Sequence, residues 1–153
     1  MDSAPMLICY DGSEASDGAI DAAAELLGPR RAVVLNVGPV LTTAEAWAAT
    51  SSVVPGNAFD DLNMAAARER ADAGVEHARR AGFTAEARTE LGAPRWETIV
   101  DVAGEIDAAL IVIGSRGLSG ARELFEGSTS HEVAEHAGRP VLIVPRRIAK
   151  EER

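Results

Sequence analysis

Short apolar runs alternate along the chain with longer segments in which apolar residues recur every three or four positions. The runs at residues 6–10, 31–37, 108–113 and 141–144 have the length of strands, and the one at 31–37 is too continuously apolar for a half-exposed strand. Residues 85–91 alternate apolar with charged side chains, which indicates a strand at a sheet edge with one face in water. The pattern predicts five strands.

Four helices are predicted between these strands. The first follows the N-cap residue Ser13 and stops at Gly28, and the second runs over residues 59–81. Pro94 fits the first turn of the third helix, and Gly138 ends the fourth. Alternating strands and helices with short strand-to-helix turns predict a single α/β domain with a doubly wound parallel sheet.

The clearest chemical signal follows the strand at 108–113. It reads Gly114-Ser115-Arg116-Gly117, then nine residues, then Gly127-Ser128-Thr129-Ser130 before the last helix. Glycine permits positive φ and lacks a Cβ, so main-chain N–H groups can close on an anion. Thr129 and Glu132 have capping-box spacing, and helix N-termini bind phosphate. The stretch predicts a phosphate site. The alternative is that the glycines only form a turn and the hydroxyl residues only cap the helix.

The spacing Gly114-x2-Gly117-x9-Gly127-Ser128 resembles the nucleotide-binding signature of the universal stress protein family, in its ATP-binding branch. The segments at residues 8–13 and 139–145 resemble the same family as well. The resemblance therefore covers nearly the whole chain, as one domain at residues 1–147 followed by a polar tail at 148–153. It implies an adenine nucleotide alpha hydrolase-like fold with strand order 3-2-1-4-5. Strands 1 and 4 would then be neighbours, and Asp11 would lie beside Gly114 where such sheets bind ligands.

The resemblance also implies which residues bind ATP and Mg²⁺. The family's phosphate-binding positions and their neighbours fall on Gly114, Gly117, Gly127 and Ser128, with Ser115, Arg116 and Thr129 beside them. Asp11 matches an acidic position near the ribose and phosphates, where it would accept from a hydroxyl or hold Mg²⁺ through water; the alternative is that it only caps the first helix. Val37 matches the place where the backbone meets the adenine edge, and Asn36 replaces the histidine frequently found before it.

Composition narrows the possible partners. The chain has 153 residues, 46% of them hydrophobic, which suits one globular domain. A net charge of −9 and a pI near 4.8 argue against nucleic acid or an anionic membrane as partner.

The single cysteine, Cys9, rules out an internal disulfide framework. Without a signal peptide or an apolar run of about 20 residues, the expected location is the cytoplasm.

Other chemistries fit less well. The only lysine is Lys150 in the tail, so a Walker P-loop is absent. Ser119 lacks the strand-to-helix turn of a hydrolase nucleophile, and His131 and His136 are spaced five apart, on different sides of a helix. No base besides Asp11 is evident for phosphoryl transfer, so at most slow ATP hydrolysis is expected.

Three functional hypotheses remain. The leading one is a nucleotide-dependent regulatory or stress-response protein. The second is a dimeric interaction module whose nucleotide site is vestigial, and the third is a slow adenine-nucleotide hydrolase or transferase. The family resemblance implies a homodimer through the edge strand Val141 to Val144, which fits each of them. The long connection at 38–57 has no assigned role.

Overall fold

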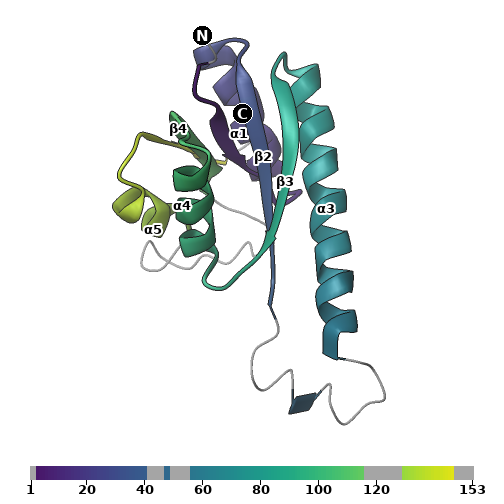
Figure 1. Ribbon diagram of the computed structural model, residues 1–153. Coiled ribbons are helices and arrows are strands. Elements are labelled where there is room, and N and C mark those ends of the chain that lie inside the picture. The colour runs from purple at the N-terminus through teal and green to yellow at the C-terminus, as the bar shows by residue number, and fades with distance from the viewer. Residues whose placement is uncertain (1–2, 41–46, 49–55, 116–128, 147–153) are drawn as a thin grey trace, which may run out of the picture.

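The computed structural model describes residues 3–40, 47–48, 56–115 and 129–146, which form a parallel sheet between two layers of helices (Figure 1). The strands are β1 (Met6–Cys9), β2 (Arg31–Gly38), β3 (Thr84–Leu91), β4 (Leu110–Gly114) and β5 (Val141–Val144). The principal helices are α1 (Glu14–Leu27), α3 (Gly56–Arg80), α4 (Arg95–Glu105) and α5 (Thr129–His136).

The strands lie in the order β3-β2-β1-β4-β5 and every neighbouring pair is parallel, so the predicted fold class is confirmed. β1 is the central strand. Its Ile8 pairs with Val34 of β2 on one side and with Val112 of β4 on the other. β3 is an edge strand, as its alternating pattern predicted.

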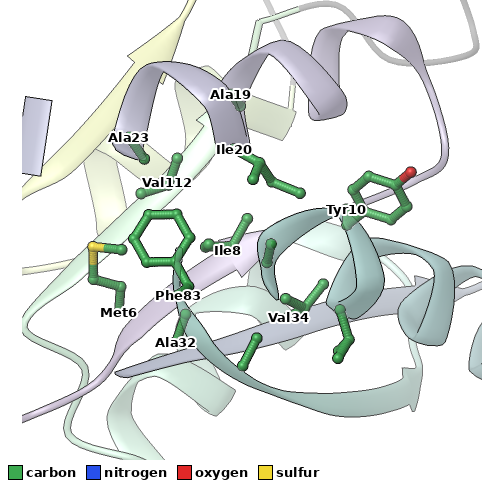
Figure 2. Close-up of a cluster of buried hydrophobic side chains, with 13 residues drawn as sticks. Met6, Ile8, Tyr10, Ala19, Ile20, Ala23, Ala32, Val34, Phe83 and Val112 are labelled. Atoms are coloured by element: carbon green, nitrogen blue, oxygen red, sulfur yellow. The ribbon is translucent and has the colours of Figure 1, made fainter. Parts of the chain in front are cut away.

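Each face of the sheet is covered by two helices. On one face, Ile8 and Val34 pack with Ile20 of α1 and Val75 of α3 (Figure 2). On the other face, Leu7, Leu35 and Ile111 pack with residues of α4 and α5. Successive residues of β1 alternate between these clusters because side chains alternate across a strand. This double coverage explains why β1, β2 and β4 are nearly continuous apolar runs.

Local sequence signals explain the ends of α1. The Ser13 hydroxyl oxygen accepts a hydrogen bond from the Ser16 N–H at 3.2 Å, which is the predicted N-cap. Gly28 ends the helix with φ of 68°, a conformation that disfavours residues with a Cβ, and its N–H donates to the carbonyl of Ala24 at 3.1 Å.

Other helix starts differ from the prediction. α3 begins at Gly56, inside the predicted connection, and Pro94 is the N-cap of α4 and not part of its first turn. α5 is described from Thr129 onward, and Ser128 before it lies outside the described residues. The Thr129–Glu132 capping box therefore stays a prediction. Within the described ranges, no helix combines the length and the apolarity that a membrane span requires.

Candidate functional site

The candidate site lies where the carboxyl ends of the three middle strands meet. β1 pairs with both β2 and β4, so the residues that follow their last paired positions reach the same edge of the sheet. This brings together Asp11 after β1, Val37 near the end of β2, and Gly114 and Ser115 at the end of β4. Ser115 continues the parallel pairing, because its N–H donates to the carbonyl of Val144 at 3.0 Å. Such strand ends are the usual ligand site of open α/β sheets.

Asp11 orders the turn between β1 and α1. Its Oδ1 accepts a hydrogen bond from the main-chain N–H of Ser13 at 2.9 Å and a second from the Ser13 hydroxyl. Gly12 between them has φ of 83°, a conformation that favours glycine. The helix cap itself is Ser13, so Asp11 does not cap α1 directly and instead fixes the residue that does. The half-buried carboxylate thereby stands at the first turn of α1.

Two reasons were predicted for glycine at position 114, a positive φ and the absence of a Cβ. The φ of Gly114 is not positive, so the first reason fails. A Cβ on Gly114 would lie only 2.8 Å from the carbonyl oxygen of Ala15 and 2.9 Å from the carbonyl carbon. The missing Cβ therefore lets the first turn of α1 approach the end of β4. Because helix N-termini carry unpaired N–H groups and a positive dipole end, this contact favours an anion nearby.

At the end of β2, Val37 is half-buried and packs on the α4 side of the sheet. Its neighbour Asn36 is only 3% exposed. The Asn36 Nδ2 donates to the main-chain carbonyl of Tyr10 at 2.7 Å, while its Oδ1 is buried and has no hydrogen-bond partner in the part of the chain that the structure describes. The sequence shows Asn36 where a histidine is frequent in the family, and it does not indicate this contact.

The second half of the predicted phosphate site is mostly outside the described residues. Arg116, Gly117, Gly127 and Ser128 belong to this part. Thr129 is described, as the half-buried first residue of α5. The roles assigned to these five residues stay predictions, and the described geometry bears on the half of the site that β1, β2 and β4 form.

Tyr10 is a residue of this region that the sequence analysis missed. Its hydroxyl donates to Asp17 Oδ1 at 2.8 Å. Burial, followed by the hydrogen bond and charge of Asp17, raises the pKa of Tyr10 to about 12. Asp17 also contacts His77 Nδ1 at 3.3 Å, and His77 Nε2 lies 2.8 Å from Asp21 Oδ1. His77 thus connects α3 to α1. Asp17 and Asp21, the partners of His77, are far from it in the sequence, so no local pattern indicates this contact. For Tyr10, its position directly before Asp11 was a visible signal.

Few of the described residues are grouped closely enough to hold a metal ion together. One group of three, Glu132, Glu135 and His136, brings its ligand atoms within 4.8 Å of one another, and two of the three residues are exposed. The His136 ring is stacked on Trp96 with centroids 4.6 Å apart. Asp11 belongs to no such group in the described ranges. A single carboxylate still suits Mg²⁺ that arrives with a nucleotide, because Mg²⁺ is commonly held by one or two carboxylates together with substrate phosphates and water.

Proteins of similar sequence show which family this chain belongs to. Residues 4–145 match the universal stress protein family. The universal stress protein YxiE of Bacillus subtilis is 37% identical over 149 residues, which cover 91% of this chain and 97% of that protein. The chain therefore belongs to the universal stress protein family.

Solved structures of the same family share the fold. A universal stress protein in complex with cAMP superimposes with a TM-score of 0.62 at 26% identity, covering 93% of this chain and 98% of that one. The universal stress protein of Archaeoglobus fulgidus in complex with dAMP gives a TM-score of 0.65 at 23% identity, covering 94% and 99%.

Proposed function

We propose that this protein is a nucleotide-dependent regulatory protein of the stress response that binds ATP together with Mg²⁺. The observation that carries the proposal is the meeting of Asp11, Gly114 and the first turn of α1 at the carboxyl edge between β1 and β4. A carboxylate, a strand end without a Cβ and a helix N-terminus there offer a cation ligand and anion-binding groups within one small region.

The predicted glycine and hydroxyl residues extend this site. In the proposal, Gly117, Gly127 and Ser128 supply main-chain and hydroxyl donors to the phosphates, and Ser115, Arg116 and Thr129 lie beside them. The backbone at Val37 meets the adenine edge. Support for an adenine nucleotide comes from the family members that were solved in complex with cAMP and dAMP. Asp11 holds Mg²⁺ through water.

Hydrolysis is a minor activity in this proposal. Fast phosphoryl transfer requires a positioned acceptor, a base and charged groups that stabilise the transition state. Asp11 is the candidate base, and its Oδ1 already accepts two hydrogen bonds from Ser13. We therefore expect slow release of ADP at most, which a time course of ADP and AMP formation would measure.

Self-association through β5 belongs to the same proposal. In the described ranges β5 pairs with β4 on one side, and the order of strands places it at the edge of the sheet. Its Ile143 is 38% exposed, and unpaired apolar edge strands tend to pair with another chain. A homodimer through this edge is therefore proposed. The cytoplasm is its proposed location. Its mass in solution, measured by light scattering for the wild type and for Ile143→Lys, should fall from dimer to monomer in the variant.

The decisive experiment is calorimetric titration of nucleotide-stripped protein with ATP, with and without Mg²⁺. The test variant is Gly127→Trp, which should block the predicted phosphate site. The matched control is Gly104→Trp, because Gly104 is exposed on α4 and an added Cβ would meet nothing within 4 Å. Saturable binding that is lost only in Gly127→Trp would support the proposal. No wild-type binding at millimolar ATP would reject it and favour the second candidate, an interaction module that acts through the β5 edge.

A further inference from the structure

Tyr10 occupies a special place in the chain. It is the only tyrosine, and it links the last residue of β1 to Asp11 in the candidate site. Figure 2 shows it at one end of the buried cluster, between α1 and α3, with its hydroxyl pointing away from Ile8 and Ile20. Any displacement of Tyr10 moves the start of the Asp11 turn.

The main chain of Tyr10 is fixed by β2. Its N–H donates to the carbonyl of Leu35 at 2.9 Å, and its carbonyl accepts from Asn36 Nδ2 at 2.7 Å. The second bond is short and lies in a buried environment, where a hydrogen bond is less screened than in water. The carbonyl that Asn36 holds belongs to the peptide group that joins Tyr10 to Asp11.

Asparagine is an energetically unfavourable residue at this buried position of β2. The preceding residues Val34 and Leu35 are apolar and buried, whereas the Asn36 Oδ1 is buried without a partner in the described part of the chain. An orphaned amide oxygen is destabilising, and an apolar side chain of similar size would remove that penalty. The contribution that offsets this penalty is the hydrogen bond from Nδ2 to Tyr10.

The side chain of Tyr10 is fixed by the two helices on the same face. Its hydroxyl donates to Asp17 of α1, and its ring lies against Gly74 of α3, where a Cβ would approach ring carbons to 2.7 Å. His77 of α3 then contacts Asp17 at 3.3 Å. Tyr10 is therefore held from β2, α1 and α3 at once.

We propose that Asn36 is a positioning residue of the nucleotide site, which holds Tyr10 and thereby keeps the Asp11 turn in its binding conformation. This inference rests on the proposed function, because the turn is assigned to nucleotide and Mg²⁺ binding there. Asn36 acts through Tyr10 and touches no ligand itself. Its loss should weaken nucleotide binding by the folded protein and loosen the turn even without ligand.

The test variant is Asn36→Leu, and Arg139→Met is its matched control. Arg139 resembles Asn36, because its NH1 donates to the carbonyl of Ala108 at 2.6 Å while its buried Nε has no partner in the described ranges. Ala108 precedes β4, so this contact lies at the opposite edge of the sheet from the candidate site. Both variants lose a bond from a side chain to a carbonyl, and only one of them should affect the site.

Two readouts separate positioning from general stability. The Kd for ATP with Mg²⁺, measured by calorimetry under conditions where circular dichroism shows each variant folded, should rise about tenfold in Asn36→Leu and stay unchanged in Arg139→Met. Amide hydrogen exchange by NMR should accelerate at the Ser13 N–H, which donates to Asp11, in ligand-free Asn36→Leu only. An unchanged Kd and unchanged Ser13 exchange in a folded Asn36→Leu protein would overturn the inference.

The two proposals can fail separately. If the wild type binds no ATP, the proposed function fails, and the exchange at Ser13 still decides whether Asn36 holds the turn. If Asn36→Leu does not fold, Asn36→Ala takes its place, because it also removes the Nδ2 donor to the Tyr10 carbonyl and is too small to overpack the site. It should weaken ATP binding about tenfold and accelerate Ser13 exchange, and a folded Asn36→Ala protein with wild-type values of both would overturn the inference.

Discussion

Two glycines in helices give a sharp test of the packing around Tyr10. Gly18 lies in α1 and Gly74 in α3, and both have ordinary helical φ. A Cβ at Gly18 would meet nothing within 4 Å, whereas a Cβ at Gly74 would lie 2.7 Å from two ring carbons of Tyr10 and 2.8 Å from Val34 Cγ1. The same change to alanine should therefore stabilise the protein at Gly18 and not at Gly74.

The magnitudes follow from two terms. Replacing glycine by alanine in a helix stabilises by about 1 kcal/mol, and this gain applies to both variants. At Gly74 the new carbon sits about 1 Å inside normal contact distance, and overpacking of this kind costs about 1–3 kcal/mol. Tyr10 cannot easily give way, because Asn36 and Asp17 hold it. The propensity gain cancels in the comparison, so Gly74→Ala should be about 1–3 kcal/mol less stable than Gly18→Ala.

The assay is urea unfolding followed by circular dichroism, with the slope m checked to be equal between variants. A difference of 1 kcal/mol corresponds to about 2–4 °C in Tm for a domain of this size. In a Tyr10→Ala background the penalty at Gly74 should shrink, because two of its three nearest atoms belong to Tyr10. Equal stabilisation by Gly18→Ala and Gly74→Ala would refute the packing argument.

Three further outcomes are expected. Ser13→Ala should lower the free energy of unfolding by about 1 kcal/mol in urea, because it removes the cap bond to the Ser16 N–H; an unchanged midpoint would contradict this. Gly114→Ala should destabilise by about 1–3 kcal/mol, because the backbone of Ala15 lies 2.8 Å from the new Cβ, and equal stability of wild type and variant in the same assay would argue against it. Tyr10 should titrate near pH 12 in the native protein and near 10 in urea, followed by tyrosinate absorbance, since burial and a neighbouring carboxylate raise its pKa. Its contribution to stability is then complete below pH 10 and lost as the pH rises to about 12, and a native midpoint at 10 would disprove the shift.

Much of the fold could be predicted because its signals are local. Ser13 and Gly28 mark the ends of α1, and the continuous apolar run of β2 identified an inner strand. The strand order came from the family resemblance and is confirmed. The starts of α3 and α4 were less accurate, because neither helix has a signal as strong as Ser13 at its beginning.

The candidate site was predictable at the level of strand ends and not of contacts. Asp11 and Gly114 reach the same edge as expected, but the positive φ predicted for Gly114 is absent. Its close contact with Ala15 was not predicted, because that contact depends on how α1 packs across the sheet. The partner of Asn36 was equally hidden. Its bond to Tyr10 depends on the register of β1 against β2, which no local pattern specifies.

The central position of β1 has a consequence for synthesis of the chain. Of the five strands β1 is translated first, and β2, α3 and β3 can pack beside it before β4 is made. Its other edge waits for β4, about a hundred residues later, since Met6 pairs with Leu110. During that interval a half-built sheet exposes the apolar edge of its innermost strand, which is a template for pairing with another nascent chain. We therefore expect the chain to be most prone to aggregation between the emergence of β3 and that of β4.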